Sequence, residues 1–275
     1  MSPGRVVWLS ASDVPDSFPP VEDALREPDG LLAAGGDLST SRILAAYRSG
    51  IFPWYDDGQP LLWWSPDPRC VFRPGDLHVS RRLLREVRNS PCELRFNTAF
   101  TDVIQACAGP RRHQRGTWIT REMRTAYERL HQEGWAHSIE VWHGDALIGG
   151  LYGLAIGHAF FGESMFSRQS NASKLALLYI NRLLSSGVVG ILDCQVQSGH
   201  LVSLGAVTIP RNEFVRQIDE LCTPPDRFAE WPAAPLSVAE LAARLRAALH
   251  TNCISDGVSA QFAGFFKPQD IQSLG

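Results

Sequence analysis

The sequence predicts an α/β (α+β) protein, in which a mixed β-sheet carries helices and follows a small N-terminal domain. Three observations support this. From residue 70 onward, strand-like and helix-like apolar patterns alternate along the chain. The first 68 residues are instead rich in Pro, Gly and Trp. After Pro224-Pro225 the pattern changes again, so we expect domains at 1–68 and 69–232 and a helical or irregular appendage at 233–275.

The N-terminal segment contains a short strand-like run at 6–9 and one capped helix. Ser39 or Asp37 can accept a hydrogen bond at the start of a helix that extends to Arg48, and Gly50 would end it. The prolines in 50–55 and 61–68 make long regular elements unexpected there.

The main domain alternates between short strands and helices. We expect strands at 69–72, 94–97, 138–142, 146–150, 152–156, 158–161 and 189–194, and helices at 80–89, 99–108, 121–132 and 174–185. A turn is expected at 203–206, and a further helix at 237–249, capped by Ser237. This order is that of the Gcn5-related N-acetyltransferase fold, so residues 69–232 are predicted to be an acetyltransferase-like domain. The analogy concerns the fold and does not fix the chemistry.

Composition restricts the class of protein. A formal net charge of −3 gives no overall field that would attract nucleic acid or acidic lipid, so a polyanion would need a local basic patch. The 6 cysteines are scattered without CxxC pairs or zinc-like spacing, which indicates reduced thiols and no metal. We expect no signal peptide, no membrane span and a cytoplasmic protein.

The segment 161–195 gathers polar residues around apolar elements. Glu163 follows a strand, and Asp193 and Gln195 end another. Strand alternation would place Asp193 and Gln195 on one face, where the carboxylate could accept from the Gln amide and orient its carbonyl. The alternatives are that these residues satisfy loop amides and that Glu163 forms a purely structural pair with Lys174. Several polar groups in apolar surroundings more often mark a site, because buried unpaired ones cost about 1–3 kcal/mol each.

Two further clusters have alternative interpretations. Aromatic residues gather before and within the main domain, and they could form a domain interface, a ligand pocket or both: Tyr47, Phe52, Trp54, Trp63, Trp64, Trp118 and Phe161. Arginines are grouped on one predicted helix and in a loop, where they could bind phosphates or form a solvated surface: Arg81, Arg82, Arg85 and Arg88, then Arg111, Arg112 and Arg115.

Several catalytic motifs are absent from the sequence. It has no GxSxG elbow, Walker loop, HExxH or dinucleotide fingerprint. Coenzyme-A-dependent members of the acetyltransferase fold carry a glycine-containing pyrophosphate loop before the central helix. Residues 168–173 (RQSNAS) occupy that position here without glycine, which argues against acyl-coenzyme A.

Taken together, the motifs resemble the leucyl/phenylalanyl-tRNA–protein transferase family. The resemblance covers about residues 22–215 and is carried by GLLAAGGDLS (30–39), YRSGIFPWY (47–55), LLWWSPDPR (61–69), GTWIT (116–120), AHSIEVW (136–142), GESMFS (162–167), NASKLAL (171–177), LDCQ (192–195), SLGA (203–206) and IPR (209–211). It implies transfer of Leu or Phe, with Met also open, from aminoacyl-tRNA to the N-terminal α-amine of proteins beginning with Arg or Lys. This creates a degradation signal of the N-end rule without a cofactor. We expect a monomer.

For the reaction that the resemblance implies, we expect the following roles for individual residues. Asp193 would orient Gln195, whose carbonyl would accept a proton from the attacking amine or position it, and Glu163 would attract the cationic acceptor. The expected substrate-binding residues are Tyr47, Trp54, Trp118, Leu151, Ser167, Leu177 and Ile180. Relatives often carry Met or Phe at the positions of Leu151 and Ile180, so pocket shape can differ. Arg81, Arg82, Arg85 and Arg88 would bind tRNA.

Three other functions compete with this one. A coenzyme-A-dependent N-acyltransferase could use the same fold, and a non-catalytic module could bind tRNA without transfer. A cell-wall peptide transferase that uses aminoacyl-tRNA is a third, but such chains usually carry duplicated acyltransferase-like domains, for which 275 residues are too few.

Overall fold

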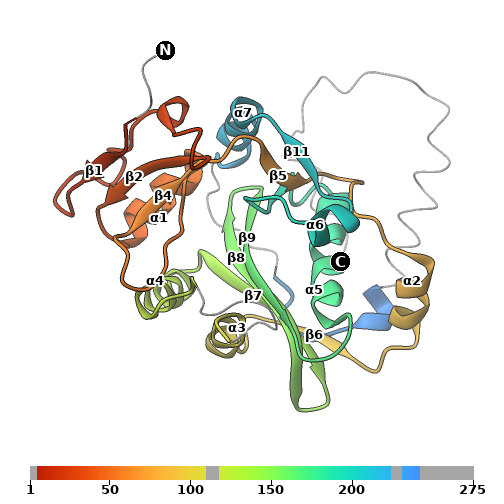
Figure 1. Ribbon diagram of the computed structural model, residues 1–275. Coiled ribbons are helices and arrows are strands. Elements are labelled where there is room, and N and C mark those ends of the chain that lie inside the picture. The colour runs from red at the N-terminus through yellow and green to blue at the C-terminus, as the bar shows by residue number, and fades with distance from the viewer. Residues whose placement is uncertain (1–4, 110–117, 224–230, 242–275) are drawn as a thin grey trace, which may run out of the picture.

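The computed structural model describes residues 5–109, 118–223 and 231–241. The predicted loop cluster of Arg111, Arg112 and Arg115 and most of the predicted helix at 237–249 lie outside the described residues. The described part contains two sheets with helices around them (Figure 1), so the predicted mixed α/β fold is confirmed.

The first sheet belongs to the N-terminal unit. Its strand order is β1 (Val7–Leu9), β2 (Leu31–Gly35), β4 (Leu62–Trp64) and β3 (Phe52–Pro53). A single-turn 3-10 helix, η1 (Val21–Asp23), precedes β2, and α1 (Thr40–Arg48) follows it, with the predicted Ser39 as N-cap. The fully buried Trp63 anchors this unit, since its indole donates to the Gly35 carbonyl oxygen at 3.0 Å.

The second sheet has eight strands and forms the main body of the molecule. Their order is β11 (Val207–Ile209), β5 (Arg69–Phe72), β10 (Ile191–Asp193), β9 (Ala159–Ser167), β8 (Ala146–Ile156), β7 (Ala136–His143), β6 (Glu93–Phe96) and β12 (Leu236–Ser237). β9 and β10 pair in parallel and the other neighbours are antiparallel, which makes the sheet mixed.

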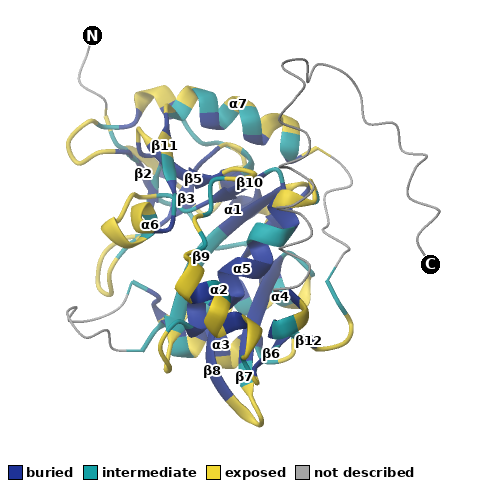
Figure 2. Ribbon diagram, turned by 90° about the vertical axis from the view of Figure 1, so that its right-hand side faces the viewer, coloured by how far each residue is buried: buried dark blue, intermediate teal, exposed yellow. Residues whose placement is uncertain are grey.

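Helices cover both faces of this sheet. α3 (Phe100–Cys107) and α4 (Arg121–Gln132) lie on one side of β7–β9, and α5 (Ala172–Ser185) lies on the other (Figure 1). Figure 2 shows α5 and the central strands mostly buried, whereas α2 (Arg81–Arg88) is exposed along its outer side. The short α6 (Gly199–Ser203) and α7 (Arg211–Leu221) complete the fold. Several described elements were not predicted from the sequence: η1, β2, β3, β4, α6, β11, α7 and β12.

The proposed domain boundaries stay predictions. The first sheet ends at Trp64 and the second begins at Arg69, on either side of the boundary proposed at 68. Within the segment predicted as an appendage, β12 pairs with β6 and adds an edge strand to the main sheet. Of the helices that the structure describes, none combines the length and the apolar character that crossing a bilayer requires.

The parallel pair β9 and β10 decides where a site can form. The two strands pair only from Ala159 to Phe161 and from Ile191 to Asp193. β10 then ends, while β9 continues along β8 to Ser167. The separation of two parallel strands at their carboxyl ends leaves a crevice, a frequent ligand site in sheets of this kind.

Candidate active site

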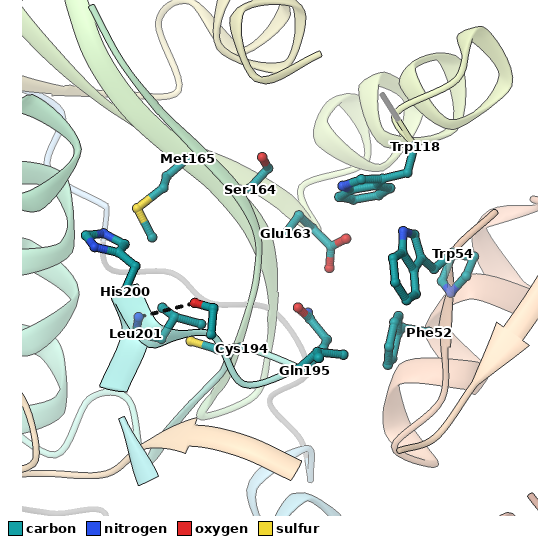
Figure 3. Close-up of a pocket in the computed structure, with 13 residues that line it drawn as sticks. Phe52, Trp54, Trp118, Glu163, Ser164, Met165, Cys194, Gln195, His200 and Leu201 are labelled. Carbon is teal, nitrogen blue, oxygen red and sulfur yellow. Dashed lines mark hydrogen bonds between the residues drawn. The ribbon is translucent and has the colours of Figure 1, made fainter. Parts of the chain in front are cut away.

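Two adjoining cavities occupy this crevice. The larger has a volume of about 330 Å³ and lies between the N-terminal unit and the main sheet (Figure 3). The smaller, of about 110 Å³, extends toward α5. Both are bordered by the same central set: Glu163, Ser164, Met165, Cys194, Gln195 and Leu201. A ligand that enters the larger cavity can therefore reach the smaller one past Glu163 and Gln195.

The two cavities differ in chemistry. Aromatic side chains of Phe52, Trp54 and Trp118 line the larger one, opposite Glu163 and Gln195 (Figure 3). Apolar side chains dominate the smaller one: Leu151, Phe160, Met165, Leu177, Leu192 and Leu201. Flat aromatic surfaces suit a planar ring system, and a closed apolar pocket suits an aliphatic or aromatic side chain.

Glu163 reaches the cavities because β9 bulges at this residue. Tyr152 pairs with Ser164 and Gly153 with Gly162, so Glu163 is the extra residue on its strand. A side chain at Gly153 could not be accommodated, since its Cβ would lie 2.2 Å from the Phe161 carbonyl oxygen. Bulges re-aim side chains near functional sites, and here the bulge turns a carboxyl group toward the crevice.

Two tyrosines hold the Glu163 carboxyl from behind. Its Oε1 lies 2.6 Å from the Tyr47 hydroxyl and its Oε2 lies 3.0 Å from the Tyr127 hydroxyl. The two hydroxyl groups are 2.6 Å apart, and both tyrosines are fully buried. Burial raises the pKa of Glu163 to about 7, although the hydrogen bonds from Tyr47 and Tyr127 lower it. Burial and the nearby Glu163 raise the pKa values of both tyrosines well above the usual range, so both stay protonated.

Gln195 is fixed through its backbone, in a different way from the one predicted. Its φ of 55° ends the strand alternation that would have placed it on the same face as Asp193. The Asp193 Oδ1 accepts from the Gln195 backbone N–H at 2.9 Å, and the Gln195 carbonyl oxygen accepts from the Cys70 N–H at 3.1 Å. The predicted bond between the Asp193 carboxylate and the Gln195 side-chain amide is therefore wrong. The amide Nε2 of Gln195 is buried without a hydrogen-bond partner in the protein.

Asp193 itself is held by Arg69. The guanidinium Nε and Nη2 donate to the two carboxylate oxygens at 2.8 and 2.7 Å, and Nη1 donates to the Gly50 carbonyl oxygen at 3.0 Å. The rings of Phe52 and Phe214 lie 4.8 and 4.6 Å from the guanidinium carbon. Arg69 thus ties β5, β10, α7 and the N-terminal unit together directly beneath Gln195.

Comparison with known proteins places this site in a family. The family model described as leucyl/phenylalanyl-tRNA protein transferase matches residues 71–219, and the model of its N-terminal domain matches residues 36–67. The chain belongs to the leucyl/phenylalanyl-tRNA protein transferase family. The resemblance inferred from the sequence is therefore confirmed.

Curated members of the leucyl/phenylalanyl-tRNA protein transferase family are similar over most of their length. The leucyl/phenylalanyl-tRNA–protein transferase of Alkalilimnicola ehrlichii is 53% identical over 228 residues, which is 82% of this chain and 88% of that protein. The one from Stutzerimonas stutzeri is 55% identical over 213 residues, 78% of this chain and 93% of that protein. The one from Pseudomonas aeruginosa is 56% identical over 209 residues, with 76% and 92% covered.

The structure brings together most of the side chains expected for this transferase family. Trp54, Trp118, Glu163 and Gln195 line the larger cavity, and Leu151 and Leu177 line the smaller one. Tyr47 lies behind the cavity wall and contacts Glu163 instead of lining the space.

Ser167 and Ile180 are placed differently from the prediction. Neither lines these two cavities. The Ser167 hydroxyl accepts from the Ser173 backbone N–H at 2.8 Å and donates to the Ser173 hydroxyl at 2.9 Å, so it satisfies the first turn of α5. Ile180 is fully buried on α5 in the core of that side of the sheet. Ser167 was expected to bind substrate because it is polar and close in sequence to Glu163. Its hydroxyl instead forms hydrogen bonds with Ser173 at the start of α5.

The α2 arginines form an exposed basic surface. Arg81, Arg82, Arg85 and Arg88 point outward, while Leu83 and Val87 are buried beneath them. Only Arg82 has an acidic partner among the described ion pairs, Glu86 at 3.0 Å. An exposed pair of this kind contributes little to stability, so the surface stays available for phosphates.

Arg69 and Tyr127 are site residues that sequence reasoning missed. Arg69 was noted only as the first residue of the predicted strand at 69–72, and Tyr127 lies in an ordinary amphipathic helix pattern. A buried strand that begins with arginine was the one available signal, because a fully buried guanidinium requires a carboxylate partner. Nothing in the helix pattern distinguished Tyr127 from a core residue.

Proposed function

We propose that this protein transfers Leu or Phe from aminoacyl-tRNA to the α-amine of proteins that begin with Arg or Lys. Membership of the family makes it an aminoacyltransferase that moves an amino acid from tRNA to protein. The choice of acceptor, the roles of individual residues and action in the cytoplasm, where aminoacyl-tRNA is made, are our proposals.

The observation that carries this proposal is the meeting of the two cavities at Glu163 and Gln195. A terminal adenosine fits in the larger cavity, against Trp54 and Trp118. A Leu or Phe side chain fits in the smaller cavity, beside Leu151 and Leu177. The ester that joins adenosine and amino acid then falls at the junction. An apolar pocket separates side chains by only about 1–3 kcal/mol per methylene, which is consistent with acceptance of Leu, Phe and Met.

The chemistry needs little help beyond positioning. The aminoacyl ester is already activated, and an N-terminal amine has a pKa of about 7.7–8.0, so part of it is neutral at pH 7. Orientation of two bound reactants can supply about 7–11 kcal/mol of the barrier. No step therefore calls for a cofactor or a metal.

Gln195 is suited to hold the reacting groups. Its unpartnered Nε2 can donate to the ester carbonyl oxygen, on which negative charge develops when the amine attacks. Its Oε1 can accept from the attacking amine. The Asp193 and Arg69 pair supports this arrangement by fixing the Gln195 backbone.

Cys194 is not suited to act as a nucleophile. Its side chain borders both cavities, but burial raises the pKa of its thiol well above the usual range. A thiol needs its thiolate form to attack an ester. We therefore favour direct attack by the amine over an acyl-enzyme intermediate.

The start of α5 argues against acyl-coenzyme A. In the acetyltransferase fold this position binds pyrophosphate through free backbone amides. Here the Ser167 hydroxyl already accepts from the Ser173 N–H, and Asn171 adopts a left-handed conformation with φ of 66°. The amide that would face pyrophosphate is already engaged.

The direct experiment mixes the protein with radiolabelled Leu-tRNA and matched peptides that begin with Arg or Glu. Labelled product with the Arg peptide and none with the Glu peptide is the expected result. Binding of tRNA without transfer to either peptide would favour a tRNA-binding module. Protection of the fold by acyl-coenzyme A would favour the acyltransferase.

A further inference from the structure

The contact among Glu163, Tyr47 and Tyr127 has an unusual hydrogen balance. The three groups form a triangle of short oxygen–oxygen contacts, at 2.6, 2.6 and 3.0 Å. Each contact needs one hydrogen to be a hydrogen bond. The two tyrosine hydroxyls supply two, because each phenol carries one hydrogen and a carboxylate carries none.

The third hydrogen is present only when Glu163 is protonated. Tyr47 then donates to Oε1, the protonated Oε2 donates to Tyr127, and Tyr127 donates to Tyr47. With an ionised carboxylate, two oxygens face each other at one of these contacts without a hydrogen between them. Both tyrosines are fully buried, so no solvent satisfies that contact. The triangle is therefore built to receive a proton.

We propose that Glu163 is the proton acceptor of the transfer reaction, and that Tyr127, with Tyr47, is a positioning residue that holds the Glu163 carboxyl in place. This inference rests on the proposed function, since it assigns a role within that same site. The Glu163 carboxyl borders the larger cavity and points toward the space between Gln195 and Trp54 (Figure 3), where the acceptor amine would lie.

The protons and electron pairs balance as follows. The bound acceptor amine enters as an ammonium group with three hydrogens, and one passes to the Glu163 carboxylate as the N–H bond breaks and an O–H bond forms. The freed nitrogen lone pair attacks the ester carbonyl carbon. A C–N bond forms, the ester C–O bond breaks, and the second hydrogen goes to the leaving ribose oxygen. The third stays on the new amide, and Glu163 releases its proton to water afterwards.

The surroundings of Glu163 match this task. The titratable groups that act on it are Tyr47 of α1, Tyr127 of α4, Asp193 of β10 and Arg69 of β5, and Tyr152 of β8 packs against the Tyr127 ring at 5.7 Å. Asp193 and Arg69 are paired, so their effects largely cancel. Burial raises the pKa of Glu163 to about 7, close to that of an N-terminal amine, and proton transfer between matched groups costs little.

Glu163→Gln is the central variant. Glutamine has the shape of the protonated carboxyl, accepts from Tyr47 and donates to Tyr127, so the triangle stays complete and the protein folds. With Leu-tRNA and an Arg peptide, kcat should fall about 100-fold or more, the range of general base catalysis. The rise of wild-type kcat with pH through about 7 should be absent from the variant.

A matched acceptor separates proton removal from binding. A peptide whose terminal amine is replaced by an aminooxy group keeps a nucleophile that is uncharged at neutral pH and needs no such base. With it, Glu163→Gln should retain wild-type kcat within roughly a factor of ten, against the roughly 100-fold loss with the ordinary amine. Equal loss with both acceptors would overturn the proposal.

Tyr127→Phe supplies a readout that a merely structural role would not move. The hydrogen bond from Tyr127 lowers the pKa of Glu163. In Tyr127→Phe, the rise of kcat with pH should therefore occur at a higher pH than in the wild type. An unmoved limb would contradict the positioning role. A Glu163→Gln variant that raises only the KM for the peptide would show charge attraction alone and overturn the proposal. If the wild-type protein transfers nothing, the proposed function itself fails, which is a distinguishable result.

Discussion

Arg69 and Asp193 form a bidentate ion pair, at 2.8 and 2.7 Å, that is almost completely buried beneath the site. A buried pair of this kind is not in itself evidence of high stability, because removing two charges from water is expensive. In this site the pair fixes the position of the Gln195 backbone. The same Asp193 oxygen that accepts from Arg69 Nε also accepts from the Gln195 backbone N–H.

Removing only one partner of the Arg69–Asp193 pair should lower the stability of the protein more than removing both charges. Arg69→Met leaves Asp193 buried and unpaired and should lower the free energy of unfolding by about 3–5 kcal/mol. The double variant Arg69→Met with Asp193→Asn removes both charges and should recover most of that loss. Urea denaturation of the three proteins measures this, and a single variant as stable as the double would contradict it.

Gln195→Ala should slow chemistry without weakening tRNA binding. Removing one donor to a developing oxyanion costs about 100- to 1000-fold in rate. Single-turnover transfer should therefore fall by about that factor, while the Kd for tRNA stays unchanged. Gln197→Ala, an exposed neighbour, is the matched control and should leave the rate unaltered. Unchanged turnover in Gln195→Ala would refute its role.

Stability should decrease with pH because of Glu163. Its folded-state pKa of about 7 lies above its ordinary value of 4.5, so the folded protein binds more protons than the unfolded chain between these values. The contribution is complete below pH 4.5, and about 3 kcal/mol is lost as pH rises through 7. Glu163→Gln should lack this slope. Thermal unfolding measured against pH in both proteins checks it, and parallel curves would argue against a buried neutral carboxyl.

His137 should make the protein less stable as pH falls, which is opposite to the effect of Glu163. Burial, and to a lesser degree the nearby His131, lowers its pKa from 6.5 to about 4. The unfolded chain therefore binds more protons in this range, and about 3 kcal/mol of stability is lost as pH falls from 6.5 to 4. The His137 ring stacks on Trp231 at a centroid distance of 4.8 Å, and a Phe ring can keep this contact. The His137→Phe variant should therefore lose less stability than the wild type as pH falls. His143→Gln at an exposed position is the control and should follow the wild type.

The exposed arginines of α2 should set the salt dependence of tRNA binding. Replacing Arg81, Arg85 and Arg88 by Gln should reduce the slope of log K against log salt by about 2 to 3, since each phosphate contact contributes about 0.7–0.9. Arg216→Gln, an exposed arginine on α7, is the control. An unaltered slope in the triple variant would show that the α2 surface is only solvated.

Local features of the fold could be predicted from the sequence with good accuracy. Ser39, one of the two predicted cap residues, caps α1, and α4 spans the predicted residues 121–132. These features depend on side chains within one or two turns of each other, so the pattern contains what is needed. β11 was not predicted because it spans only three residues, and α7 was missed although Phe214, Ile218 and Leu221 follow helical spacing.

The candidate site was predicted only in part. Glu163, Gln195 and Asp193 were identified from their position between apolar elements, but their partners were not. The bulge that turns Glu163 into the crevice requires two strands in a shifted register. The left-handed conformation of Gln195 results from bonds to Asp193 and Cys70. Neither feature has a local sequence signal.

By itself the sequence determined the alternation of strands and helices, their caps, the membership of the transferase family and the identity of the polar residues at the crevice. The tertiary structure decided which groups meet there. Tyr47 and Glu163 are 116 positions apart, and Arg69 and Asp193 are 124 apart. Periodicity and capping act over a few residues, whereas the proton triangle and the buried ion pair exist only after distant strands and helices pack. The geometry of the site is therefore a property of the packing, which no local pattern contains.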